Sequence, residues 1–254
     1  FLIAAIAMLV EVPAPAWTPP LLALFFTISY VMLAPFVGAL ADSMPKGRVM
    51  MISNFIKVAG CLMMFTTVHP LLAYAVVGFG AAAYSPAKYG ILTELLPPEK
   101  LVAANGWIEG TTVGSIILGA VVGGALITPL VANTLLGLDF PGLNTGIDTP
   151  AESALVVIAL IYVLAAVINL GIPDTGARYP RQLRHPINLI RAFIRSNRVL
   201  WSDKLGQISL AITTLFWGAG ATLQFIVLDW ARESLGMPLN PAALLQGIVA
   251  VGVA

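Results

Sequence analysis

The sequence predicts an all-α protein that crosses a membrane several times. Of its 254 residues, 59% are hydrophobic and only 10% are charged, whereas a soluble domain carries about 25% charged residues. The apolar residues form separate runs of about 20, the length that a helix needs to cross a bilayer. Lys and Arg gather in alternate connections between these runs. This composition excludes a soluble globule, and a net charge of only +1 argues against a nucleic-acid partner.

Charged, proline-rich and glycine-rich turns divide the chain into eight predicted spans. The first and the last begin or end inside an apolar run, so we expect a fragment of a longer protein, with no visible signal peptide. The predicted spans are 1–10, 21–40, 48–68, 71–95, 102–126, 154–171, 207–230 and a partial span after residue 241. They imply an N-terminal bundle over 1–172, a basic connector over 173–204 and the start of a C-terminal bundle over 205–254.

The basic residues predict the orientation of the spans. Positively charged loops stay on the cytoplasmic side of a membrane. Loops at one end of the spans hold ten basic residues, and loops at the other end hold only Arg232. The ten are Lys46, Arg48, Lys100, Arg178, Arg181, Arg184, Arg191, Arg195, Arg198 and Lys204. We therefore expect the connector to be cytoplasmic.

The connector has two interpretations that do not exclude each other. Over residues 187–200, Arg191, Arg195 and Arg198 recur at helical spacing, with apolar residues largely on another face. This pattern is typical of a helix that lies on the anionic inner surface of the membrane. The second interpretation is a solvated tether between two six-helix halves.

Three ionisable residues fall inside predicted spans, where a charge is costly and therefore suggests a function. They are Lys57, Lys88 and Glu109. At 1.5 Å per residue, each lies roughly 10 to 13 Å from the cytoplasmic end of its span. We expect Glu109 to neutralise one lysine, which leaves one positive charge to face an anionic group such as a phosphate. The alternative is that each lysine extends to the nearby interface and binds nothing.

The surroundings of Lys88 favour a binding site. Small residues precede it, and these permit close contact between helices. Pro86 frees a backbone carbonyl and kinks the helix, which is tolerated in a membrane beside a cavity or a neighbouring helix. We include Tyr84 and, from the seventh span, Trp217 as candidates to line the cavity.

The run GALADSMPKGR at 38–48 resembles the signature loop between the second and third helices of major facilitator superfamily transporters. The resemblance implies that Gly38, Asp42, Gly47 and Arg48 help to gate the cytoplasmic side. Asp42 is two residues farther from Gly47 and Arg48 than in the usual pattern.

A closer resemblance covers most of the chain. Five runs resemble the bacterial lysophospholipid transporters of that superfamily: APFVG at 34–38, KGRVMM at 46–51, GAAAYSPAKYGIL at 80–92, ANG at 104–106 and LFWGAG at 215–220. The resemblance implies a twelve-helix transporter in the bacterial inner membrane. Its substrates would be lysophosphatidylethanolamine and lysophosphatidylglycerol, delivered to the inner leaflet for re-acylation by an acyltransferase/acyl-carrier-protein synthetase. We expect a monomer whose partners are this substrate and the membrane lipids.

Two positions depart from the family pattern. The acidic residue of the family's first helix would precede Phe1. Gln224 stands where the enterobacterial members of the family carry an arginine, and its amide can still hydrogen-bond a head group without supplying charge. Head-group preference is therefore open.

Two other functions remain open. One is a transporter of a soluble anion or drug with the same fold, and the other is a membrane module fused to, or docked on, a lipid acyltransferase. The sequence shows no Ser-His-Asp, metal-ligand or phosphate-loop spacing, so we expect no enzyme, no metal and no cofactor.

Overall fold

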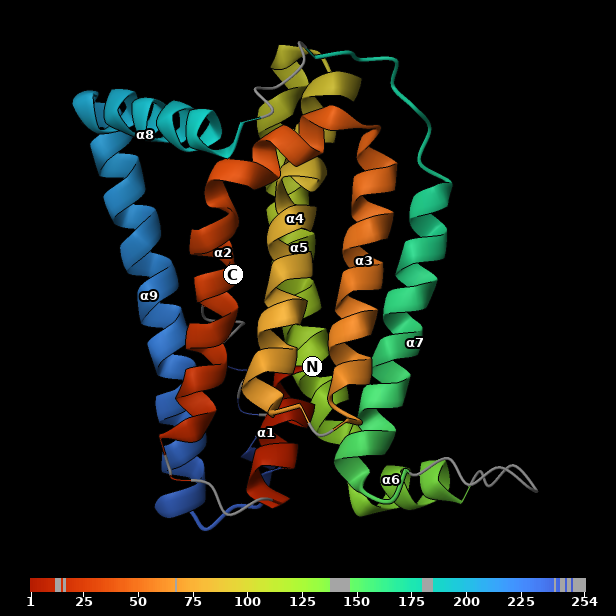
Figure 1. The fold of residues 1–254 in the computed structure, drawn as a ribbon. Helices are drawn as coiled ribbons and strands as arrows, with labels where there is room; N and C mark the ends of the chain where they lie inside the picture. Colours follow the sequence, from red (N-terminus) through yellow and green to blue (C-terminus); the bar gives the residue numbers. More distant parts are fainter. Residues whose placement is uncertain are drawn as a thin grey trace.

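The computed structural model describes residues 1–11, 15, 17–66, 68–137, 147–179, 185–239 and a few positions among 241–248. In this part of the chain, every regular element is an α-helix. The long helices stand side by side, while two shorter helices, α6 and α8, lie across opposite ends of the bundle (Figure 1). The predicted all-α fold is confirmed.

Seven helices correspond to the predicted spans. They are α1 (Leu2–Glu11), α2 (Thr18–Ser43), α3 (Lys46–Met63), α4 (Pro70–Leu95), α5 (Pro98–Leu126), α7 (Pro150–Leu170) and α9 (Lys204–Glu233). By length and composition, α2, α4, α5, α7 and α9 can cross a membrane. α3 is less apolar because its 18 residues include three basic side chains, yet it packs between α4 and α7 (Figure 1). The predicted span after residue 241 lies mostly outside the described residues.

The structure differs from the prediction at two connections. α3 ends at Met63, five residues before the predicted end. The N–H groups of Met64, Phe65 and Thr66 each bond to the carbonyl three residues earlier, as in a 3₁₀-helix, so the α-helical pattern stops there. The predicted loop after the fifth span contains a short helix, α6 (Pro129–Leu136), which begins with a proline. The rest of that loop, residues 138–146, lies outside the described part.

The helix starts follow from local sequence signals. Proline occupies the first or second position of α2, α4, α5, α6, α7 and α8 (Pro186–Ser202), where its missing N–H breaks no helical hydrogen bond. Thr149 and Glu152 form a capping box at the start of α7. Asp203 caps α9 by accepting a hydrogen bond from the Gly206 N–H at 2.8 Å.

α2 bends near the basic end of the bundle, the end at which α2 stops and α3 begins. Pro35 lies inside this helix, and a proline there removes a hydrogen bond and pushes the preceding turn away. The last turns of α2 lean toward α3 (Figure 1). The bend brings the end of α2 over the start of α3.

Apolar side chains form two buried clusters. The larger contains Ile6, Leu22 and Leu155 and surrounds α1. The smaller lies at the basic end and contains Ala41, Val49, Met50 and Ala87. Many other large apolar side chains on the spans are exposed, including Met32, Trp107 and Leu118. An apolar outer surface of this kind is typical of a protein surrounded by lipid and is not found on a soluble protein.

Candidate functional site

Lys88 lies between α4 and α5 with two partners. Its Nζ donates a hydrogen bond to Thr112 Oγ1 at 3.0 Å and stands 4.5 Å from the centroid of the Tyr89 ring. The Tyr89 hydroxyl in turn donates to Glu109 Oε1 at 2.6 Å. An ammonium over an aromatic face is attracted by the ring. Tyr89 therefore connects the predicted cation with the predicted acid.

Glu109 balances Lys88 without a direct ion pair. Among the described residues, ion pairs within 4.0 Å join Lys46 with Asp42, Lys46 with Glu94, and Arg178 with Asp174. The Glu109 carboxylate attracts Lys88 electrostatically, but it accepts its short hydrogen bond from the Tyr89 hydroxyl. The structure thus brings the two predicted residues together, with Tyr89 between them.

Lys57 occupies a separate position inside the bundle. Its Nζ donates to Asn54 Oδ1 at 3.1 Å and lies 4.4 Å from the Tyr84 ring and 5.4 Å from the Tyr162 ring. The rings belong to α4 and α7, so this lysine joins three helices. Tyr84, which the sequence placed near Lys88, therefore contacts Lys57.

Although their direct partners differ, the two lysines and the glutamate influence one another electrostatically. Lys57 and Lys88 are close enough to repel each other, and Glu109 is close enough to attract Lys88. Two positive charges and one negative charge leave one net positive charge at this level of the bundle. Such a group can bind an anion through charge-assisted hydrogen bonds.

The candidates from α9 lie away from this group. Trp217 is 47% exposed and contacts the ring of its neighbour Phe216 edge-on, and Gln224 is half-buried. In Figure 1, α2 stands between α9 and α4 at the middle of the bundle. In the described part of the chain, the structure therefore does not bring Trp217 or Gln224 to Lys88.

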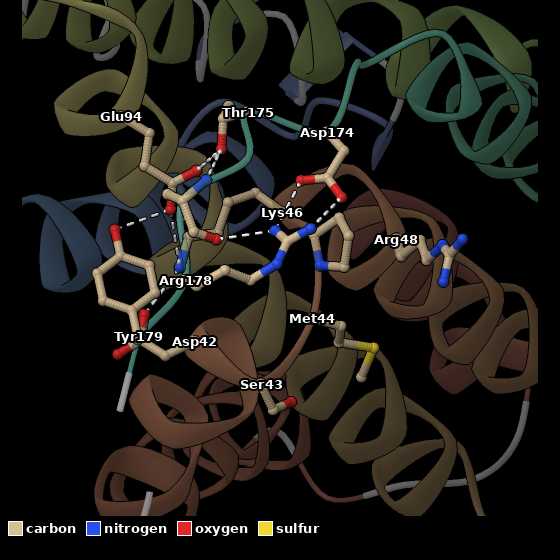
Figure 2. Close-up of a pocket in the computed structure, with 12 residues that line it drawn as sticks. Asp42, Ser43, Met44, Lys46, Arg48, Glu94, Asp174, Thr175, Arg178 and Tyr179 are labelled. Atoms are coloured by element: carbon tan, nitrogen blue, oxygen red, sulfur yellow. Dashed lines mark hydrogen bonds and ion pairs between the residues drawn. The ribbon is translucent and has the colours of Figure 1, made fainter. Parts of the chain in front are cut away.

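A pocket of about 320 Å³ opens at the basic end of the bundle. The turn between α2 and α3, the end of α4 and residues 174–179 of the connector form its walls (Figure 2). We name this last segment the connector start. The pocket therefore lies where the basic ends of several spans meet the chain that leaves α7.

Lys46 is the central cation of this pocket, with a side chain only 4% exposed. Its Nζ donates to Asp42 Oδ1 and to the Ala41 carbonyl, both at 2.8 Å, and lies 3.4 Å from Glu94 Oε1. It also lies 4.7 Å from the centroid of the Tyr179 ring. The lysine thus ties α2, α3, α4 and the connector start together.

Glu94 anchors the connector start to α4. Its side chain is 5% exposed and accepts hydrogen bonds from Thr175 Oγ1 at 2.5 Å and from the Tyr179 hydroxyl at 2.8 Å (Figure 2). The hydrogen bond to Glu94 raises the pKa of Tyr179, because the phenol must stay protonated to donate it. On the outer side, hydrogen bonds from Arg178 lower the pKa of the exposed Asp174 carboxyl.

The four predicted gating residues lie at this end, in different environments. Asp42 pairs with Lys46, whereas Arg48 lines the pocket and points away from Lys46 (Figure 2). Gly47 permits the close approach of the chain after α7, since an added Cβ would lie 2.9 Å from Ile172 Cβ. An added Cβ at Gly38 would meet nothing within 4 Å.

Sequence reasoning missed several of these residues. Lys46 and Glu94 were not among the candidates, although Asp42 and Lys46 have the four-residue spacing that favours an ion pair. Thr112 and Tyr162 carry no signal in the sequence that separates them from other polar residues of the spans. Tyr89 directly follows Lys88, but its direction depends on the rotation of α4.

Comparison with known proteins identifies the family. The model of the Major Facilitator Superfamily matches residues 4–254. The chain is 42% identical over 253 residues to the lysophospholipid transporter LplT of Serratia proteamaculans (strain 568). This match covers 99% of this chain and 58% of that relative. It is 41% identical to the transporter of the same name from Yersinia pestis (strain Pestoides F), over 99% of this chain and 57% of that relative. No solved structure matches the chain.

The chain thus spans less than three-fifths of the length of these relatives. Its apolar helices and its match to the superfamily over almost every residue agree with each other. The chain is a multi-pass membrane protein that belongs to the major facilitator superfamily.

Proposed function

We propose that the full-length protein moves lysophospholipids, chiefly lysophosphatidylethanolamine and lysophosphatidylglycerol, to the inner leaflet of the bacterial inner membrane. The observation that carries the proposal is the identity of 41–42% to two lysophospholipid transporters along 99% of this chain. The net positive charge around Lys88 supports it, because both head groups contain a phosphate.

In this proposal, Lys88 binds the phosphate. An ammonium has three donors, and the hydrogen bond to Thr112 uses one of them. The remaining donors are available to phosphate oxygens, and Tyr89 holds the ammonium from one side. Lys57, with Tyr84, supplies a second positive charge nearby. Glu109 attracts the ammonium of an ethanolamine head group, while Gln224 and Trp217 of α9 contribute after a rearrangement of the two halves.

The acyl chain stays against the apolar outer faces of the spans. Transferring a chain through a polar cavity exposes its methylene groups to water at about 0.8 kcal/mol each. The exposed apolar side chains of the spans offer the chain a surface without this cost. Only the head group then needs a polar route.

Transport requires two halves that rock about the head-group site. We propose residues 1–172 as part of the first half, 173–204 as the connector and 205–254 as the start of the second. The basic end is cytoplasmic, and the cluster of Asp42, Lys46 and Glu94, with Gly38, Gly47 and Arg48, controls its opening. The protein works as a monomer and supplies an acyltransferase/acyl-carrier-protein synthetase with substrate.

The test is uptake of labelled lysophosphatidylethanolamine by spheroplasts that carry the full-length protein. Wild type is compared at matched membrane expression with Lys88→Ala, Glu109→Gln and the control Lys100→Ala, which changes a cation at the basic end outside the site. We expect uptake by wild type and the control, loss in Lys88→Ala, and a weaker preference for the ethanolamine head group in Glu109→Gln.

Three results contradict parts of the proposal. A well-expressed wild type without uptake removes the lysophospholipid substrate and directs attention to soluble anions. Equal uptake by wild type and Lys88→Ala removes the phosphate contact. Re-acylated lipid formed by the purified protein alone would indicate an acyltransferase module.

A further inference from the structure

α8 carries a stripe of exposed apolar side chains that the bundle does not cover. Ile187, Ile190, Ile194 and Trp201 are 51%, 38%, 52% and 56% exposed. Their separations of three, four and seven residues place them on one face of the helix. Leu189 and Phe193 lie on the neighbouring face and are less exposed, and α8 packs on α2. The stripe is therefore additional to the surface that holds α8 in place.

Three arginines border this stripe. Arg191, Arg195 and Arg198 are exposed and recur at separations of four and three residues, so they form a second stripe along one edge of the first. The helix contains no Asp or Glu. Basic residues that only set the orientation of a span need no particular spacing. The spacing of these arginines instead gives the helix one apolar face and one cationic edge.

A tight corner fixes α8 relative to the span that follows it. The Gln207 side chain donates to the Trp201 carbonyl at 2.5 Å, and Asp203 accepts from the Gly206 N–H. A Cβ at Gly206 would collide with the Leu200 carbonyl, so glycine permits the close approach. α8 consequently lies across the basic end while α9 runs along the bundle (Figure 1). If α9 crosses a bilayer, α8 lies in the plane of its surface.

We propose that α8 docks on an anionic lipid surface, with its apolar stripe between the head groups and its arginines on the lipid phosphates. An in-plane helix with an apolar face and a basic edge binds such a surface through both buried area and charge attraction. A solvated tether would leave four large apolar side chains in water. The basic edge makes an anionic membrane the matching surface. This inference does not depend on what the bundle transports.

The test measures the depth of a spin label on full-length protein in liposomes. A label at position 194 reports the stripe, and a label at Ser196, which is exposed on the opposite face, is the matched control. Collision rates with dissolved oxygen, which enters lipid, and with a water-soluble nickel complex are measured in phosphatidylcholine alone and in a mixture with phosphatidylglycerol.

We expect the label at 194 to meet oxygen and to be protected from nickel, more so in the mixture, while the label at 196 meets nickel in both. In the variant Arg191→Gln, Arg195→Gln, Arg198→Gln, the ratio of docked to solvated label should fall roughly a hundredfold in the anionic mixture. Replacing Lys100 and Arg232 by Gln should not change it.

Two outcomes overturn the proposal. A label at 194 that meets nickel as freely as the label at 196 shows a solvated tether. A label at 194 that is protected from both reagents, whatever the lipid, shows that protein covers the stripe.

Discussion

Glu109 is connected to Lys88 through the side chain of Tyr89. The hydroxyl of this tyrosine donates to the glutamate at 2.6 Å, while its ring lies 4.5 Å from the lysine ammonium. The hydrogen bond keeps the carboxylate occupied. The ammonium therefore stays attracted by a negative charge and still has donors for an anion.

Tyr89→Phe should weaken phosphate binding although it keeps the ring. Without the hydroxyl, Glu109 is free to pair directly with Lys88 and to compete with the substrate. A lost hydrogen bond to a charged group is worth about 1.5–3 kcal/mol, so we expect the KM for lysophosphatidylglycerol uptake to rise by roughly tenfold or more. Adding Glu109→Gln to this variant should restore the KM, whereas a merely structural role of Tyr89 predicts no rescue.

Gly80→Ala should destabilise the bundle. An added Cβ would lie 2.6 Å from the Ser53 carbonyl oxygen and 2.8 Å from Lys57 Cγ on α3, so α3 and α4 would have to separate. We expect a loss of about 1–3 kcal/mol, measured as a lower Tm of the detergent-solubilised protein. The control is Gly90→Ala on the same helix, where the nearest atom is the flexible end of Lys46 at 3.4 Å. Equal melting temperatures for the two variants would disprove the tight contact.

Lys46→Met should destabilise the basic end more than loss of the exposed pair beside it. The substitution leaves the buried Glu94 carboxylate without its cation, and removing one partner of a buried pair costs roughly 3–5 kcal/mol. Arg178→Gln breaks an ion pair whose side chains are 70% and 44% exposed, so little change in Tm is expected. Adding Glu94→Gln to Lys46→Met should recover part of the loss. Similar Tm values for Lys46→Met and Arg178→Gln would mean that Lys46 does not hold the helices together.

Tyr179 should make the attachment of the connector start sensitive to alkaline pH. Its pKa is raised, first because its hydroxyl donates to Glu94. A raised pKa means that the contact stabilises the folded protein fully below the ordinary tyrosine pKa. This stabilisation is lost as pH rises through the raised value.

The titration of Tyr179 can be isolated by ultraviolet difference spectroscopy of wild type against Tyr179→Phe. In a Glu94→Gln background, the pKa of Tyr179 should move back down. An unchanged pKa in that background would show that Glu94 is not the cause.

The apolar runs and the prolines predicted most of the helices, because both signals are local. The same holds for α8, whose arginine spacing is helical. Contacts between helices depend on rotation, and neighbouring residues on a helix point about 100° apart. The sequence therefore placed Lys88 and Glu109 at one level but assigned Tyr84, rather than Tyr89, to Lys88.

The cluster at the basic end shows a second limit. Two basic residues, Lys46 and Arg48, begin α3, and only the packing of α4 and the connector start decides that Lys46 is the buried one. Glu94 has the appearance of an ordinary residue at a helix end. Its role depends on Thr175 and Tyr179, which are more than 80 residues away.

Lys57 and Lys88 should differ in what their removal costs. Lys57 is held by Asn54 and by the rings of Tyr84 and Tyr162, so Lys57→Met should lower both transport and Tm. Each ring contact of a partly desolvated cation is worth about 1–2 kcal/mol. Lys88→Met gives up one hydrogen bond and one ring contact and should lower uptake with a smaller change in Tm. Uptake and Tm measured on the same preparations separate the two roles. If Lys88→Met lowers the Tm as much as Lys57→Met does, Lys88 stabilises the bundle. Its lost uptake would then be a consequence of the destabilised structure.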